Sequence, residues 1–147
     1  MKILVIHQYY LMPGSPGGSR FNEFARLWAD AGHEVTVIAG TLNYSTGEVP
    51  EHLRGRWLTR DDDGPVRVVR CYVPSVYHRG RAGRSVAYWA FAASALSAAA
   101  VVPRPDVVIA TSPPLNIVVP GYLAARYAWR GVPWVFEVRD LWPGSVI

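Results

Sequence analysis

The chain contains a single cysteine, Cys71, and this scarcity excludes a fold held together by disulfide bonds. It also fits a protein that works in a reducing compartment. Cysteine and histidine do not occur at the spacings that bind zinc, so we expect no metal site. The apolar run in residues 1–10 is too short for a secretory signal peptide, and no small-residue cleavage site follows it. We therefore expect a strand at the amino terminus and a cytoplasmic protein.

Charged residues are also few, at 18% of the 147 residues, whereas hydrophobic residues make up 50%. This composition excludes a disordered chain and provides enough apolar material for one domain with its own core. The net charge of +4 is concentrated between residues 54 and 84, where Asp61, Asp62 and Asp63 are the only acidic residues. The arginines of this segment are Arg54, Arg56, Arg60, Arg67, Arg70, Arg79, Arg81 and Arg84.

An arginine-rich segment suits partners that carry phosphate, because the planar guanidinium group makes two parallel hydrogen bonds to an anion. Nucleic acid, an anionic membrane surface and a phosphorylated ligand are all compatible with it, and so is a solvated face without a partner. The positive charge is confined to one segment, however, and the sequence has no known nucleic-acid-binding motif. We therefore expect no nucleic-acid partner.

The order of the apolar segments predicts an α/β fold. Expected strands alternate with expected helices, which is typical of a parallel sheet with helices on both faces. Residues 56–73 could also form a hairpin that turns at Asp63 and Gly64. Ser19 is placed to cap the first helix, and Pro120 is placed to kink the last one. The expected strands are 2–6, 34–39, 66–73, 106–111 and 133–138, and the expected helices are 19–31, 85–102 and about 115–130.

The helix expected over residues 85–102 carries no charge. It is at the short end of the roughly 17–25 residues that cross a bilayer, and its many alanine and serine residues make it only weakly apolar. A buried or interfacial helix is therefore favoured over a membrane span. Arg79, Arg81 and Arg84 precede it and Trp89 lies near its start, and such cations beside aromatics are typical of an interfacial membrane contact. A core helix with an exposed basic turn is the alternative.

The loop after the first strand is a candidate anion site. Gly17 and Gly18 allow close approach to the backbone, and the following helix offers free N–H groups near Arg20. A turn with a surface arginine is the alternative. The glycines do not match G-x-G-x-x-G, no acidic residue ends the second strand, and no P-loop lysine is present, which disfavours dehydrogenases and P-loop enzymes. Ligands of parallel α/β sheets bind beyond the carboxyl ends of the strands, which here selects residues 7–20, 111–116 and 139–145.

Five segments of the chain together resemble a known family. They are "MKILVIHQYY", "PGGSR", "AGHEVTVIAG", "ATSPPLNI" and "WVFEVRDLWPGS", in this order. The sequence is similar over essentially its whole length to the amino-terminal half of GT-B glycosyltransferases of family 4, and most similar to the branch that builds bacterial surface polysaccharides on lipid carriers. The resemblance implies one of two facing Rossmann-like domains and sugar transfer with retention of anomeric configuration. It also implies that Gly17 and Gly18 approach the phosphates of the donor.

The same resemblance places further residues at the acceptor. It implies that Asp140 is the catalytic candidate, as a polar contact or proton acceptor at the incoming hydroxyl. Glu137 and Arg139 are candidates for acceptor binding, with an ion pair between them as the alternative, since buried charges are usually paired. Trp142 would stack on a sugar or pack in the core. His7 would line the cleft or be a hydrogen-bonded core histidine.

The resemblance implies that residues 1–147 are an incomplete acceptor-side domain without the carboxy-terminal donor-binding domain. We expect a nucleotide-sugar as co-substrate, bound mainly by that missing domain, and no cofactor. The expected partners are the nucleotide-sugar donor, a lipid-linked or glycan acceptor, the donor domain and the anionic inner face of the cell membrane. The chain alone is expected to be inactive, since nothing closes the cleft against water. The alternative is a non-catalytic α/β module that pairs with a separate donor-domain subunit.

Overall fold

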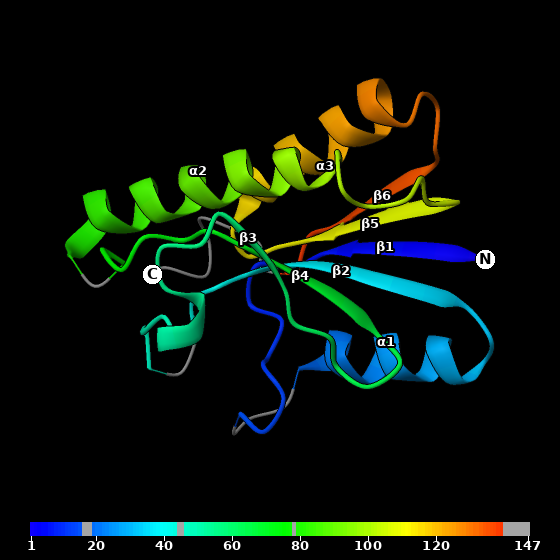
Figure 1. Ribbon diagram of the computed structural model, residues 1–147. Helices are drawn as coiled ribbons and strands as arrows, with labels where there is room; N and C mark the ends of the chain where they lie inside the picture. The colour runs from blue at the N-terminus through cyan, green and yellow to red at the C-terminus, as the bar shows by residue number, and fades with distance from the viewer. Residues whose placement is uncertain (16–18, 44–45, 78, 140–147) are drawn as a thin grey trace.

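A six-stranded, mostly parallel sheet forms the centre of the protein (Figure 1). The computed structural model describes residues 1–15, 19–43, 46–77 and 79–139. The strands are β1 (Lys2–Ile6), β2 (Glu34–Gly40), β3 (Leu58–Arg60), β4 (Arg67–Cys71), β5 (Val107–Thr111) and β6 (Trp134–Glu137). The helices are α1 (Arg20–Asp30), α2 (Gly80–Ala98) and α3 (Val118–Leu123), with short 3₁₀ turns η1 (Glu51–Leu53) and η2 (Leu115–Ile117) and a π-helical turn η3 (Ala124–Ala128).

The sheet order is β3-β4-β2-β1-β5-β6, and every neighbouring pair is parallel except β3 with β4. The central strand β1 pairs with β2 on one side and β5 on the other, so that Ile6 lies beside both Ile38 and Ala110. The expected parallel α/β sheet is therefore confirmed. The hairpin is also confirmed, since Asp63 bridges to Val66 around a turn that contains Gly64.

Helices cover both faces of the sheet, with α1 on one face and α2 and α3 on the other (Figure 1). Alternate residues of β1 serve the two faces, because successive side chains of a strand point in opposite directions. Leu4 and Ile6 belong to the core beneath α2 and α3, and Val5 packs with Phe21 of α1. Both faces of the central strand are thus buried, in agreement with its continuous apolar sequence.

Helix α2 begins at Gly80, earlier than the sequence pattern predicts, so Arg81 and Arg84 lie on the helix itself. Its first turns pack closely on the chain before it: a Cβ atom added to Gly83 would lie 2.1 Å from the carbonyl oxygen of Val76. Farther along, the Ser94 hydroxyl donates to the Tyr72 carbonyl at 3.0 Å. Its buried residues include Ala87, Phe91, Ala95 and Ala98, which recur every three or four positions, so one side of α2 packs on the core.

The last helical segment runs without a break from Leu115 to Ala128, close to the helix that the sequence predicts, and its hydrogen-bond pattern changes from 3₁₀ to α to π along the way. Pro120 is the third residue of α3 and has no N–H to donate to the preceding turn. The π-helical turn η3 follows and the segment ends near Gly131, whose φ is 81°. Within the described ranges, no helix is long and apolar enough to cross a bilayer.

Candidate functional site

The carboxyl ends of β1, β5 and β6 lie side by side, and the residues that follow them form the candidate site. In the register of the sheet, Thr111 at the end of β5 is opposite Glu137 at the end of β6. The Ser112 hydroxyl accepts a hydrogen bond from the backbone N–H of Arg139 at 2.9 Å. The three segments selected by the strand-end rule therefore meet at one edge, as far as the structure describes them.

Glu137 pairs with Arg20 across this edge. One carboxylate oxygen of Glu137 accepts from the Arg20 guanidinium group, and the other accepts from the Thr111 hydroxyl at 2.7 Å. The partner of Glu137 is thus Arg20 at the start of α1, rather than the neighbouring Arg139 that the sequence suggests as the alternative. A hollow of about 400 Å³ is lined by Arg20, Glu137, Val138 and Arg139, which joins a donor-side candidate to the acceptor-side candidates.

His7 lies directly behind this charged edge and is only 2% exposed. Burial, together with the positive charges of Arg139 and Arg20, lowers the pKa of His7 from its ordinary 6.5 to about 3. The imidazole is therefore neutral at physiological pH. Its Nδ1 atom has no hydrogen-bond partner among the described residues, so His7 is buried without being the satisfied core histidine that was one expectation. A neutral ring with a free nitrogen can accept or donate one hydrogen bond, according to its tautomer.

The loop that leaves β1 is held by Arg70, which is fully buried. Its guanidinium group donates to the carbonyl oxygens of Tyr10 at 2.6 Å and Leu11 at 3.1 Å, and to the Asp61 carboxylate at 2.9 Å. Burial lowers the pKa of Arg70, and the charge of Asp61 opposes that effect. Placing Arg70 in a surface patch with the neighbouring arginines was therefore wrong, because it is an internal brace for the loop.

A second group of polar side chains supports the same loop from α1 and the hairpin. The buried Asp63 carboxylate accepts from the Tyr10 hydroxyl at 3.1 Å and from Arg26 at 2.9 Å. Asn22 bonds the backbone of Leu11 with both amide atoms, at 3.0 and 3.1 Å. The sequence reading missed these roles. The available signal was a polar residue within an apolar pattern, as Arg70 is in β4 and Asn22 in α1.

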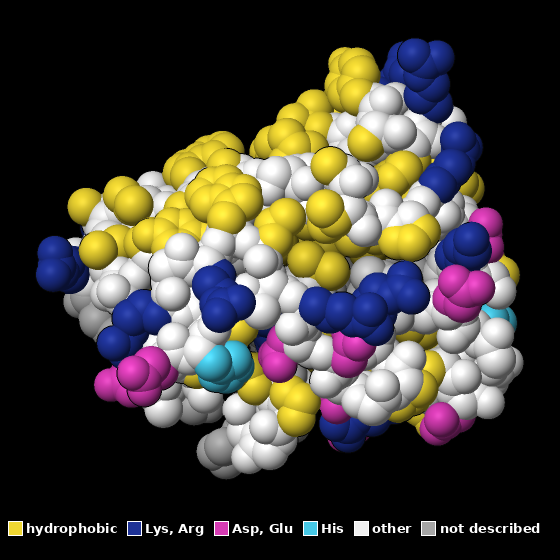
Figure 2. Space-filling model, viewed as in Figure 1, with side chains coloured by type: hydrophobic (Ala, Val, Ile, Leu, Met, Phe, Trp, Pro, Cys, Tyr) yellow, Lys and Arg dark blue, Asp and Glu magenta, His cyan; other side chains and the backbone are white. Residues whose placement is uncertain are grey.

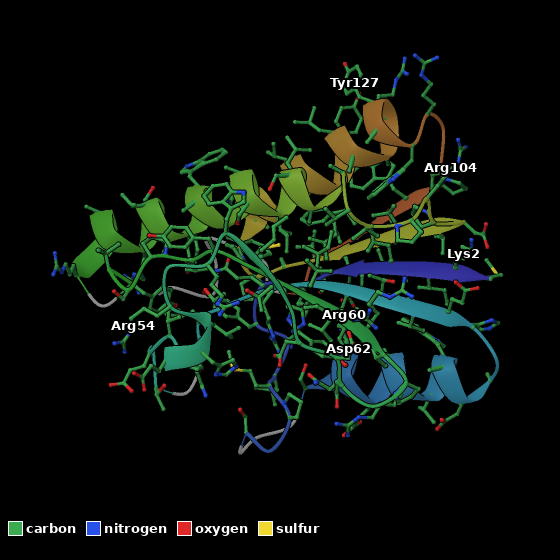
Figure 3. The ribbon with its side chains drawn as sticks, viewed as in Figure 1. Lys2, Arg54, Arg60, Asp62, Arg104 and Tyr127 are labelled. Atoms are coloured by element: carbon green, nitrogen blue, oxygen red, sulfur yellow. The ribbon has the colours of Figure 1, made fainter. Side chains whose placement is uncertain are left out.

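A further arginine of the arginine-rich segment is paired within the hairpin and is therefore not free to bind a partner. Arg60 donates to Asp62 at 2.6 Å, and Figure 3 shows the two residues side by side. The hydrogen bond from Arg60 lowers the pKa of the Asp62 carboxyl. The three aspartates of the segment are therefore matched with arginines of the fold, and they leave the arginines of α2 unopposed.

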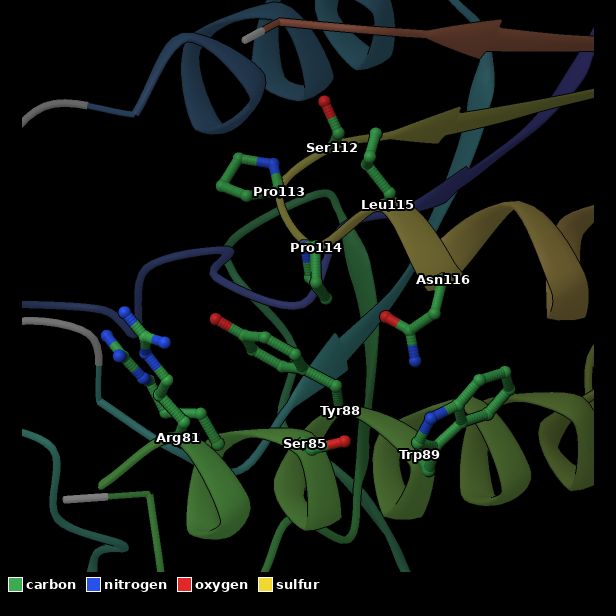
Figure 4. Close-up of a pocket in the computed structure, with 10 residues that line it drawn as sticks. Arg81, Ser85, Tyr88, Trp89, Ser112, Pro113, Pro114, Leu115 and Asn116 are labelled. Carbon is green, nitrogen blue, oxygen red and sulfur yellow. The ribbon is translucent and has the colours of Figure 1, made fainter. Parts of the chain in front are cut away.

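A groove of about 630 Å³ lies between the start of α2 and residues 112–116 (Figure 4). Arg81, Arg84, Tyr88 and Trp89 line it from α2, and the loop after β5 forms the opposite wall. The Ser112–Pro113 and Pro113–Pro114 peptide bonds of this loop are both cis. Three of the four residues predicted to contact lipid, Arg81, Arg84 and Trp89, thus lie across the groove from residues 112–116, which follow the end of β5. Arg79 is exposed beside it, at the N-cap of α2.

The groove has hydrogen-bonding capacity that the fold leaves unused. Arg79, Arg81 and Arg84 make no ion pair within the described residues. Both side-chain atoms of the Asn116 amide are buried without a partner in that same part of the chain. Figure 4 shows this amide pointing from the loop toward α2. An anionic or hydroxylated ligand would supply partners that the protein does not.

Four predicted site residues, Gly17, Gly18, Asp140 and Trp142, lie outside the described residues, so their roles stay predictions. The described residues hold no group of acidic, histidine or cysteine side chains that could bind a metal ion. The thiol of Cys71 is buried, and burial raises its pKa, which leaves it protonated and unreactive.

Comparison with known proteins decides the family. Residues 17–146 match the model of the Glycosyl transferase 4-like domain. The chain belongs to this family. Its fold is similar to that of a solved E. coli structure described as trehalose-6-phosphate bound with UDP-2-fluoro glucose, with a TM-score of 0.55 and 11% identity. A comparison with curated protein sequences gave no significant match.

The structural match covers 94% of this chain but 32% of the E. coli chain, so this 4-like domain spans about a third of that protein's length. The resemblance to the amino-terminal half of a family 4 GT-B glycosyltransferase is confirmed for family and for fold. The sheet with helices on both faces is the Rossmann-like arrangement that was expected.

Proposed function

We propose that this glycosyl transferase 4-like domain is the acceptor-side half of a glycosyltransferase. The enzyme would move a sugar from a nucleotide-sugar to a lipid-linked glycan, with retention of anomeric configuration. The observation that carries the proposal is the convergence of Arg20, Glu137 and His7 at the carboxyl edge of the sheet, in a chain of a glycosyltransferase family. Arg20 and the groove arginines offer the phosphate-binding groups that both substrates would need.

In this proposal Arg20 and the preceding glycines, Gly17 and Gly18, approach the donor phosphates. The first N–H groups of α1 face the same region, and they favour an anion there. The carboxylate of Glu137 holds the Arg20 side chain in place until phosphate competes for it. His7 keeps a neutral ring close to two arginines, where it bonds a hydroxyl without adding charge. Asp140 remains the candidate that accepts the proton of the incoming hydroxyl.

The nucleotide-sugar would be bound mainly by a carboxy-terminal donor domain that faces this edge. Without that domain the charged edge is open to water, which screens its charges and admits hydrolysis. We therefore expect no useful transfer by the chain alone, and transfer when a donor domain is added. A non-catalytic module that pairs with a separate donor subunit is the second candidate.

Peripheral membrane contact is proposed for the outer side of α2. Val86, Trp89 and Leu96 lie on this side and are exposed, and Figure 2 shows hydrophobic side chains gathered over α2 and α3. The helix has no acidic residue, and Arg79, Arg81 and Arg84 cluster at its start. Apolar side chains along this side, together with cationic side chains at the start of the helix, suit the surface of an anionic membrane.

Two titrations followed by amide NMR test the proposal. One uses UDP-glucose or a guanosine diphosphate sugar, and the other uses a short-chain polyprenyl diphosphate-sugar. Shifts around Glu137, Arg139 and the start of α2 with the lipid-linked sugar would support an acceptor half. Strong shifts around Gly17 and Gly18 with the nucleotide-sugar alone would show a self-sufficient nucleotide binder and would contradict it. Sugar transfer by the isolated chain would contradict the expected inactivity.

A further inference from the structure

The groove between α2 and residues 112–116 has a charged part and an apolar part. Arg81 and Arg84 come from the first turns of α2 and supply the charge. Tyr88 and Trp89 follow them along the helix, and Leu115 stands on the opposite wall. A ligand that fits this lining must itself be amphiphilic, with an anionic end and an apolar end.

The charged part suits a phosphate or diphosphate group. Arg81 and Arg84 are three residues apart, so their side chains leave the same face of the helix. No acidic side chain among the described residues lines the groove, and neither arginine has an ion-pair partner there. Two free guanidinium groups on one face provide enough donors for a headgroup with more than one negative charge.

The apolar part suits a slim hydrocarbon chain. Trp89 is 57% exposed and Leu115 is 41% exposed, although the two residues line the same groove from opposite walls. A chain laid between them would remove apolar surface from water on both walls at once. The volume of about 630 Å³ is within the roughly 300–1,000 Å³ that is usual for small-molecule sites.

The groove also opens onto the outer side of α2, because Trp89 belongs to both. Val86 is one turn before Trp89 on that helix and is exposed as well. A lipid that rests in a membrane beneath α2 could therefore extend its headgroup and first carbons into the groove while the rest of its chain stays in the bilayer. This continuity distinguishes the groove from a site for a soluble sugar phosphate.

We propose that this groove binds the headgroup and the first carbons of a single-chain lipid diphosphate, with the phosphates at Arg81 and Arg84 and the chain between Trp89 and Leu115. The inference rests on the proposed function in one respect, the lipid-linked acceptor. It goes beyond that function by assigning the lipid to a groove within the protein, in addition to the membrane surface around it.

Three probes that are soluble without vesicles test the inference on the 147-residue chain: geranyl diphosphate, inorganic diphosphate and geraniol. Geranyl diphosphate should bind at least tenfold more tightly than either of the others, with amide shifts at Tyr88, Trp89 and Leu115. Equal affinity for inorganic diphosphate would show an anion site only and would overturn the inference. Equal affinity for geraniol would show a purely apolar groove and would overturn it too.

Variants locate the binding. Arg84→Gln should weaken geranyl diphosphate and inorganic diphosphate about equally, by roughly tenfold. Leu115→Asn should weaken geranyl diphosphate by several-fold and leave inorganic diphosphate unchanged. Arg56→Gln and Leu27→Asn are matched controls, since both residues are exposed and lie outside the groove. If Leu115→Asn binds geranyl diphosphate as tightly as the wild type, the chain does not lie in the groove.

The inference and the proposed function can fail separately. Binding to vesicles of phosphatidylcholine with one-third phosphatidylglycerol measures the membrane contact, and transfer with an added donor domain measures the reaction. Normal results in both assays, with no binding of geranyl diphosphate, would overturn only the groove. Binding of geranyl diphosphate without vesicle binding or transfer would leave the groove in place and overturn the proposed function.

Discussion

On the α1 side of the sheet arginine side chains are bonded to the fold, whereas on the α2 side they have no ion-pair partner among the described residues. Arg70 and Arg26 hold the loop after β1 through Asp61, Asp63 and backbone carbonyls. Arg81 and Arg84 line a groove and meet no carboxylate in the described part. Arginines that are close together in the sequence thus differ in role. Some stabilise the loop after β1, and only those without an ion-pair partner are available to bind a ligand.

The most severe way to break this contrast is to remove Arg70. Arg70→Met should lower the free energy of unfolding by about 3–5 kcal/mol, because the carbonyls of Tyr10 and Leu11 and the Asp61 carboxylate lose their buried donor. Urea unfolding followed by circular dichroism measures the change. Arg56→Met is the matched control and should stay within about 0.5 kcal/mol. A similar small change in Arg70→Met would show that the loop does not need its brace.

The buried histidine gives a pH dependence of intermediate size. The pKa of His7 is about 3 in the fold and 6.5 ordinarily, so the unfolded chain binds the extra proton between these values. The contribution of neutral His7 to the free energy of unfolding is fully present above pH 6.5. It is lost as the pH falls toward 3, by about 1.4 kcal/mol for each pH unit below 6.5. At pH 5 the loss is about 2 kcal/mol.

His7→Gln removes this group, so its free energy of unfolding should fall less steeply between pH 6.5 and pH 4 than that of the wild type. Equilibrium urea unfolding at several pH values provides the comparison. The value of each protein at neutral pH is the reference for its own series, because the remaining titratable groups are the same in both proteins. Identical slopes in the two series would show that the fold does not lower the pKa of His7.

On the other side of the sheet, loss of one unpaired arginine should affect binding rather than stability. Arg84→Gln should weaken binding to anionic vesicles by about 1 kcal/mol, or roughly fivefold, since a cation near such a surface contributes that much. Its free energy of unfolding should be unchanged within about 0.5 kcal/mol. Co-sedimentation with vesicles at two salt concentrations measures the first effect. A loss of stability without a change in vesicle binding would show that Arg84 stabilises the fold, as Arg70 does, and does not contact the membrane.

Only a small stability effect is expected at the ion pair of Arg20 and Glu137. The two side chains are 47% and 33% exposed, and ion pairs at this exposure contribute about 0–1 kcal/mol. Glu137→Gln should therefore cost less than about 1 kcal/mol of unfolding free energy. Thermal unfolding of this variant beside Arg70→Met makes the comparison direct. A cost near that of Arg70→Met would mean that the pair is there for the fold.

Most of the sheet could be predicted from the sequence because its central strands β1, β2 and β5 are largely continuous apolar runs. The predicted bounds of β1 match the structure, and those of β2 differ by one residue. The start of α2 was missed because Gly80 and Gly83 are typical of a loop, although Gly83 is required where the helix touches the carbonyl of Val76. A glycine that a helix requires for close packing cannot be recognised from the sequence, because the requirement comes from the backbone that packs against it.

The candidate site was only partly predictable, for the same reason. The strand-end rule selected segments whose described parts do meet at one edge of the sheet, since the rule depends on topology alone. The pairing of Glu137 with Arg20 joins residues 117 positions apart, and no local pattern encodes it. The groove depends on how the loop after β5 packs against α2, so its two arginines could be named in advance but its shape could not.

The distance along the chain between Arg20 and Glu137 has a consequence for synthesis. β1, β2 and β4 are all made before residue 72, so much of the sheet can pair while the rest of the chain is still inside the ribosome. Among the described residues β6 pairs only with β5, and Glu137 is its last residue. The ion pair between Arg20 and Glu137 can therefore form only after that short strand has emerged.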